Sequence, residues 1–153
     1  MPEGIAAQRE RLIAGLISYG AGFTELGRRF AEALGVHTTD AFALLEISAA
    51  EVSGAPLSPA LLGKRITLTS GAMTALLNRL ERAGYLTRTR EHTDRRVVTL
   101  RTSPAVVGLA QEFFGPLNTR QETILAEYSP ELLRQFEDLV TRLRGTIDDQ
   151  LAD

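Results

Sequence analysis

The sequence predicts a mostly α-helical protein with one small β-hairpin, and three observations predict it. Apolar residues recur every three to four positions over most of the chain, as on the buried face of a helix. Ser-Pro pairs begin at Ser58, Ser103 and Ser129, each before such a stretch. The hydroxyl satisfies an unpaired N–H at a helix start and proline has none to lose there, so each pair predicts a helix N-terminus. Between Gly84 and Arg101 the period changes from about 3.6 to 2, which indicates strands.

The first third of the chain predicts a long helix or helix pair over about residues 5–34, followed by a second helix. Four glycines weaken the first, each by up to about 1 kcal/mol relative to alanine; they are Gly15, Gly20, Gly22 and Gly27. They predict either a bend near residues 20–22 or a place where another helix comes close. The second helix begins at Thr38 or Thr39 and runs to about Val52, where Ser53-Gly54-Ala55-Pro56 ends it.

A short helix, a turn and a further helix come next. The short helix runs from Ser58 to about Ile66, the turn covers residues 67–69, and the further helix covers about 69–84. One side of that last helix is an apolar stripe, which contains Met73, Leu76, Leu77 and Leu80. The other side carries small and polar residues. Gly84 is placed to end the helix in the left-handed conformation.

The segment after Gly84 predicts an antiparallel hairpin. Its arms cover about residues 86–90 and 96–101 and are rich in β-branched residues. Glu91-His92-Thr93-Asp94-Arg95 forms a polar, basic tip. The alternation is imperfect because Val97 and Val98 are adjacent.

Two long helices close the chain. One runs from Pro104 to about Tyr128, and Gly115-Pro116 is expected to kink or break it because proline removes a backbone hydrogen bond. The other runs from Pro130 to about Leu151 with a regular apolar stripe and a length of roughly 30 Å. That is longer than a small binding module needs, so the stripe and the first helix predict a surface between subunits. A purely intramolecular bundle is the alternative.

Charge is unevenly distributed along the chain. Residues 64–101, the basic segment, contain nine Lys or Arg and three Asp or Glu, a net charge of +6. The other 115 residues contain eight basic and sixteen acidic side chains, a net charge of −8. Sixteen of the seventeen cations are arginine, which suits bidentate contacts to phosphate and guanine. A basic segment in an acidic body predicts one surface for a polyanion, with an ordinary solvated face as the alternative.

Several classes of protein are excluded by what the sequence lacks. Without cysteine there are no disulfides, thiolate metal sites or cysteine nucleophiles. There is no G-x-S-x-G, glycine-rich phosphate loop or H-E-x-x-H, and the two histidines, His37 and His92, lie 55 positions apart. We therefore expect no enzyme, no cofactor and no metal. No apolar run approaches the ~18 residues of a membrane span, and Glu3 stands where a signal peptide needs positive charge, so we expect no membrane partner and a cytoplasmic location.

The order short helix, turn, helix and basic hairpin is the layout of a winged helix-turn-helix, which binds double-stranded DNA. A recognition helix enters the major groove and needs short donors and acceptors with little bulk. The helix at 69–84 offers Thr69, Ser70, Gly71, Thr74, Ala75, Asn78 and Arg79. Asparagine can pair with adenine, methyl groups can contact thymine and arginine can reach phosphate. The hairpin, or wing, offers Arg88, Arg90, Asp94, Arg95 and Arg96 beside the minor groove.

The residues of this module resemble the multiple-antibiotic-resistance regulator (MarR) family. The resemblance rests on Leu76-Leu-Asn-Arg-Leu-Glu-Arg-Ala-Gly-Tyr-Leu-Thr-Arg88 and on Asp94-Arg-Arg-Val-Val-Thr-Leu100, and it extends over nearly the whole chain. It implies a single domain over 1–153 and a cytoplasmic transcriptional regulator. Residues 5–34 and 104–151 would be dimerisation helices, and 38–102 the DNA-binding module. The homodimer would bind a pseudo-palindromic operator.

The resemblance also implies roles for single residues and a class of effector. Asp94 and Arg96 match the Asp-x-Arg of the family's wing, where the arginine contacts DNA and the aspartate holds arginines in place. Thr102-Ser103-Pro104 departs from the family's usual Leu-Thr before the next helix, although Ser103 can still cap it. The missing cysteines exclude the thiol-oxidation branch, and the sparse histidines exclude the zinc-sensing type.

Family members often bind small aromatic or phenolic acids between the dimerisation helices and the winged module. Residues able to line such a cleft are Tyr19, Phe23, Phe30, His37 and Phe42. Aromatic residues at helical spacing are more often core residues, so that alternative stays open for each of them. Two functions without DNA also stay open: a winged helix that binds another protein, and a helical module that binds a small ligand. The basic segment argues against both, because a protein-binding groove favours exposed apolar anchors.

Overall fold

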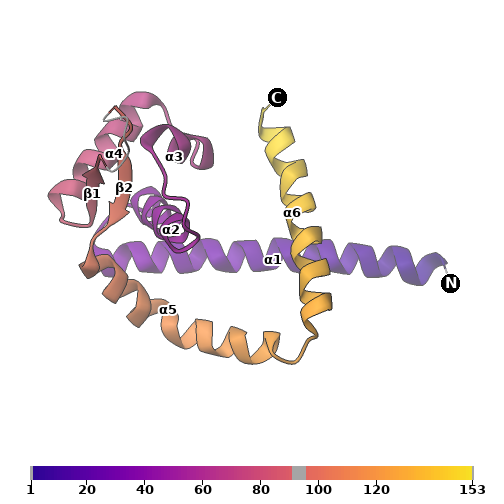
Figure 1. Ribbon diagram of the computed structural model, residues 1–153. Helices are drawn as coiled ribbons and strands as arrows, with labels where there is room; N and C mark the ends of the chain where they lie inside the picture. Colours follow the sequence, from indigo (N-terminus) through magenta and orange to yellow (C-terminus); the bar gives the residue numbers. More distant parts are fainter. Residues whose placement is uncertain (1, 91–95, 153) are drawn as a thin grey trace. The chain divides into compact units, whose positions relative to one another are not determined.

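Six helices and one two-stranded sheet make up the part of the chain that the computed structural model describes, residues 2–90 and 96–152 (Figure 1). The elements in chain order are α1 (Pro2–Leu34), α2 (Thr38–Val52), α3 (Pro59–Arg65), α4 (Ser70–Arg82), β1 (Leu86–Thr89), β2 (Thr99–Thr102), α5 (Pro104–Leu125) and α6 (Pro130–Ala152). They divide into two compact units, Met1–Gln111 and Glu112–Asp153. The mostly helical prediction with one hairpin is confirmed.

All three predicted Ser-Pro helix starts are confirmed. The hydroxyl oxygens of Ser58, Ser103 and Ser129 each accept a hydrogen bond from the backbone N–H three residues later, at 3.2, 3.4 and 3.2 Å. In each case proline follows as the first helical residue. These N-termini are therefore determined by local chemistry.

The helix α1 continues from Pro2 to Leu34 without a break, and Gly35 ends it with a φ of +70°. Of the two expectations for its glycines, the close approach is confirmed at Gly27. The ring of Phe42 from α2 lies over that position, and an added Cβ would come within 2.5 Å of its Cζ. A Cβ added at Gly20 or Gly22 would have nothing within 4 Å, and the helix runs through both positions, so residues 5–34 form one long helix and not a helix pair.

The core of the first unit lies where α1, α2, α3, α4 and the hairpin meet. Its largest fully buried apolar side chains are Phe30, Leu44, Ile47, Leu62, Leu76, Leu77, Leu80, Leu100 and Val106. The predicted stripe of α4 is confirmed, because all four of its apolar side chains are buried. Gly84 has a φ of +77°, so it ends α4 in the left-handed region as predicted.

The hairpin pairs antiparallel from Leu86 opposite Thr102 to Thr89 opposite Thr99. Its second arm is shorter than predicted, because β2 begins at Thr99 and residues 96–98 are not strand. Two adjacent valines cannot both face the core from an extended strand, and Val97 is 36% exposed. The N–H of Leu100 donates to the carbonyl of Leu57 at 2.8 Å, so the segment before α3 also supports the sheet.

Two polar contacts anchor the base of the hairpin to the first two helices. The hydroxyl of Tyr85 donates to the carbonyl oxygen of Leu34 at the end of α1, at 2.9 Å. The carboxylate of Glu51, near the end of α2, accepts hydrogen bonds from the backbone N–H and the hydroxyl of Thr102. Residues 51 positions apart in sequence therefore hold α4 and the wing against α1 and α2.

The helix α5 runs from Pro104 to Leu125 and continues through Pro116. The sequence predicts a kink or a break at Gly115-Pro116, and a break does not occur there. Proline removes one backbone hydrogen bond, and the hydroxyl of Thr119 adds a bond to the carbonyl of Gly115 at 3.0 Å. No side chain of α6 is buried among its described residues, and its apolar stripe is exposed. Among the described helices, none is long and apolar enough to cross a membrane.

Candidate nucleic-acid interface

One side of α4 presents a row of small and polar side chains. Thr69 caps the helix, its hydroxyl oxygen accepting from the N–H of Ala72 at 3.1 Å. The predicted contact residues that follow are all exposed; they are Ser70, Gly71, Thr74, Ala75, Asn78 and Arg79. The hydroxyl proton of Thr74 is used by the carbonyl of Ser70 at 3.0 Å, so its oxygen can accept and its methyl group remains available. The surface has the small size and mixed polarity that entry into a major groove requires.

Arg79 is joined to a buried carboxylate on α2. Its Nη2 and Nε donate to Oδ1 and Oδ2 of Asp40 at 2.8 and 3.3 Å. The Asp40 side chain is 2% exposed and that of Arg79 is 43% exposed. The hydrogen bond to Asp40 raises the pKa of Arg79. Asp40 lies in the first turn of α2, where the helix dipole also favours a negative charge.

Arg88 lies on β1 and reaches back to α4. Its Nη2 donates to Oδ1 of Asn78 at 2.9 Å, and its Nε donates to Oε1 of Glu81. The wing is therefore tied to the exposed side of α4 through one guanidinium. The sequence predicts Arg88 and Asn78 as site residues but not the two carboxylates, Asp40 and Glu81. The position of Asp40 in a first helical turn was a weak signal, since acidic residues are common there.

Most of the other basic residues of the segment lie in different surroundings from Arg79 and Arg88. Arg65 at the end of α3 pairs with Glu46 of α2 at 3.1 Å. Lys64 and Arg82 are exposed and form no ion pair within residues 2–90 and 96–152. Arg90 and Arg96 are exposed on either side of the tip, whereas the predicted wing residues Asp94 and Arg95 lie outside the described residues. Carboxylates thus neutralise Arg65, Arg79 and Arg88, whereas Lys64 and Arg82 have no carboxylate partner in the described part of the chain.

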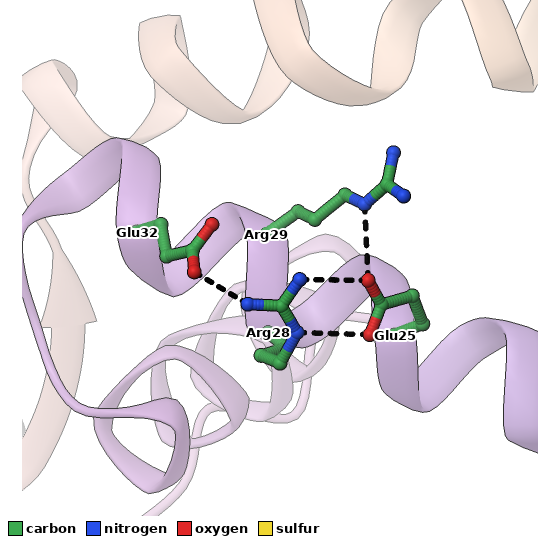
Figure 2. A network of polar contacts seen from close by, with 4 residues as sticks. All are labelled: Glu25, Arg28, Arg29 and Glu32. Atoms are coloured by element: carbon green, nitrogen blue, oxygen red, sulfur yellow. Dashed lines mark hydrogen bonds and ion pairs between the residues drawn. The ribbon is translucent and has the colours of Figure 1, made fainter.

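Charges on α1 form a separate network. Figure 2 shows Arg28 between Glu25 and Glu32, with Arg29 also reaching Glu25. Hydrogen bonds from Arg28 and Arg29 lower the pKa of Glu25 to about 2. All four residues lie close together along one helix, so this cluster stabilises the helix and leaves no excess of positive charge.

The five residues predicted to line an effector cleft lie in different surroundings. Tyr19 and Phe23 are exposed on α1, and Phe42 packs on Gly27. Phe30 is 1% exposed and belongs to the core. His37 lines a shallow groove of about 320 Å³ whose other residues are Thr39, Leu68, Ala72, Ala75, Leu76 and Arg79. No group of three or more His, Asp or Glu suited to a metal occurs in the described part of the chain.

Comparison with known proteins gives a consistent set of relatives. Residues 52–98 match the family model described as MarR family. An uncharacterized HTH-type transcriptional regulator, YcgE of Bacillus subtilis strain 168, is 30% identical over 123 residues, which cover 79% of this chain and 76% of YcgE.

Solved structures agree at lower identity. A mutant of MepR from a multidrug resistant S. aureus clinical isolate matches with a TM-score of 0.66 at 17% identity over 90% of this chain and 96% of MepR. The S. aureus MepR–DNA complex matches with a TM-score of 0.54 at 17% identity, over 86% of this chain and 95% of the MepR chain. NadR in complex with 4-hydroxyphenylacetate matches with a TM-score of 0.61 at 22% identity, over 85% of this chain and 89% of the NadR chain. These likenesses support the same winged-helix fold.

Proposed function

This chain belongs to the MarR family of transcriptional regulators, and from that premise we propose that it acts as a homodimer on a pseudo-palindromic operator. It is a DNA-binding regulator and not an enzyme. The observation that carries the proposal is the exposed side of α4, small and polar, on a helix whose opposite side is wholly buried. Two such helices would occupy half-sites about one turn of DNA apart, roughly 10 bp.

Base contacts are proposed for the first two turns of α4 and for Asn78, and phosphate contacts for Arg79. Thr69, Ser70, Gly71, Thr74 and Ala75 would lie in the major groove. Asn78 follows on the same side, and Arg79, held by Asp40, would face the backbone. The wing would add Arg90, Arg95 and Arg96 near the minor groove, with Asp94 orienting them and Arg88 of β1 fixed against Asn78.

Dimerisation is proposed through residues 5–34 and 104–151, with residues 38–102 as the DNA-binding module. Each dimerisation segment carries exposed apolar side chains. On α1 they are Ile5, Leu12, Ile13, Ile17, Tyr19 and Phe23. On α6 they are Leu132, Phe136, Leu139, Val140, Ile147 and Leu151. Apolar faces of this extent favour burial against a second copy.

Small-molecule control is proposed through an aromatic or phenolic acid. The groove that contains His37 supports it, because a ligand there would lie against Ala75 and Arg79 of the proposed recognition helix. Tyr19 and Phe23 are candidates to meet the same class of ligand once a partner covers α1. A regulator of transcription works where the DNA is, so we propose a cytoplasmic location.

A gel shift with the intergenic DNA beside the chain's own gene, at two salt concentrations, tests the proposal. Affinity is expected to fall by orders of magnitude from low to moderate salt. Arg82→Ala should reduce the slope of log K against log salt by about 1, and Arg120→Ala, an exposed arginine outside the basic segment, should not change it. Thr74→Val should weaken binding to the operator more than to random DNA. The proposal would be contradicted by binding that does not depend on salt, or by an equal change of this slope in Arg82→Ala and Arg120→Ala.

A further inference from the structure

Asn78 is held by a partner that can only donate hydrogen bonds. The Nη2 of Arg88 lies 2.9 Å from Oδ1 of Asn78. A guanidinium has five N–H groups and no acceptor, so the amide oxygen must face it and the amide nitrogen cannot. The two hydrogens of Nδ2 are therefore left for a ligand against the exposed side of α4.

The guanidinium is itself fixed in place. Its Nε donates to Oε1 of Glu81, three positions after Asn78 and so on the same side of the helix. Arg88 projects from β1, so Asn78, Glu81 and Arg88 form a bridge between α4 and the wing. Free rotation of the Asn78 amide would break this bridge.

The orientation of the amide determines which base edge it suits. In the major groove adenine presents a donor, N6, beside an acceptor, N7, whereas guanine presents two acceptors, O6 and N7. Asparagine pairs with adenine by accepting through its oxygen and donating through its nitrogen. Here one lone pair of the Asn78 oxygen is used by Arg88, which leaves that oxygen less able to accept a second hydrogen bond. The N6 donor of adenine would have to share that oxygen with the guanidinium, whereas the acceptors of guanine need only the free N–H groups of the amide.

We propose that Asn78 donates through Nδ2 to a guanine and that Arg88 is the positioning residue that sets this preference. The inference rests on the proposed DNA-binding function. It replaces the expectation from sequence alone that Asn78 pairs with adenine. The bridge to Arg88, ten positions later and on a strand, is the feature that changes the chemistry of the amide.

The test begins with selection of binding sites from a random duplex library by the full chain. Competition between duplexes that differ at one base pair then gives base preferences. At the position where Asn78→Ala loses its preference, the unsubstituted protein is expected to favour guanine over adenine by about tenfold. Arg88→Met keeps the aliphatic stem and frees the amide, so this ratio should fall to near one. Arg82→Ala removes a charge elsewhere on α4; it should weaken binding to all duplexes and leave the ratio unchanged.

A second measurement needs no variant of Arg88. Replacing that guanine by 7-deazaguanine, which lacks the N7 acceptor, should weaken binding of the unsubstituted protein about fivefold and leave binding of Asn78→Ala unchanged. Three results would overturn the inference. The unsubstituted protein could prefer adenine at this position, or a folded Arg88→Met variant could keep the same ratio of guanine to adenine binding. The third is an equal loss of affinity for the 7-deazaguanine duplex in the unsubstituted protein and in Asn78→Ala. If the selected binding site contains no position whose base preference depends on Asn78, this inference is wrong and the proposed DNA-binding function still stands. A selection that yields no sequence preference would overturn the proposed function as well.

Discussion

Replacing Gly27 by alanine should destabilise the protein, although alanine is the better helix former. The new Cβ would lie 2.5 Å from Cζ and 2.7 Å from Cε1 of Phe42, where contact needs about 3.4 Å. The ring would have to move back by about 0.9 Å inside a packed unit. Such overpacking costs roughly 1–3 kcal/mol, and helix propensity offsets about 1 kcal/mol of it. The expected net loss in the free energy of unfolding is about 0–2 kcal/mol.

Gly20→Ala is the matched control on the same helix. Nothing lies within 4 Å of its added Cβ, so only the propensity term applies and the variant should gain up to about 1 kcal/mol. The two alanine variants should therefore differ by about 1–3 kcal/mol. For a chain of this size each kcal/mol shifts the Tm by about 2–4 °C. Urea and thermal unfolding at one fixed protein concentration measure the difference, because the stability of a dimer depends on concentration.

A double variant separates the steric cause from a general effect on α1. Phe42→Leu shortens the side chain over Gly27. It should therefore lower the free energy of unfolding less in the Gly27→Ala variant than in the unsubstituted protein. The reasoning is refuted if Gly27→Ala is as stable as Gly20→Ala. It is also refuted if the effects of Gly27→Ala and Phe42→Leu simply add.

Three polar contacts give further predictions. Asp40→Asn removes the charge that pairs with Arg79 and should lower the free energy of unfolding by about 1–3 kcal/mol in urea titrations; an unchanged value would mean that the pair contributes nothing net. Tyr85→Phe removes the bond to Leu34 and should cost about 1 kcal/mol in the same assay, whereas no loss would show that water replaces the hydroxyl. Because the pKa of Glu25 is lowered from 4.5 to about 2, its contribution is present above pH 4.5 and disappears as the pH falls towards 2. The urea midpoints of Glu25→Gln and the unsubstituted protein should therefore differ at about pH 6 and converge near pH 2, and a constant difference would contradict this.

The features that local chemistry determines could be predicted from the sequence. A serine before a proline places a helix start within one residue because the hydroxyl and the missing N–H act within a single turn. Gly84 could be placed as a helix end for the same reason, since only the chain around it decides its conformation. Of the kink or break expected at Pro116, the break does not occur, because proline removes only one backbone hydrogen bond and α5 continues through it for 22 residues in all.

The partners of the charged side chains could not be predicted, because they lie far apart in sequence. Asp40 and Arg79 are 39 positions apart, and nothing in the pattern of either helix shows that the first turn of α2 meets α4. In the sequence, Arg79 and Arg88 are two of the nine basic residues of the basic segment that is expected to meet a polyanion. In the folded chain each is joined to a carboxylate from α2 or α4.

This division changes how the basic segment is expected to work. A cation held by a carboxylate contributes less to the attraction of DNA over a distance, but its position is defined before the DNA arrives. Arg82 and Lys64, which have no such partner among the described residues, are the cations expected to set the salt dependence. Arg79 and Arg88 are expected to act through geometry, by fixing the recognition helix and the amide of Asn78. A charge reversal at Arg82 should therefore weaken binding to every sequence, whereas loss of Arg88 should change which sequence is bound.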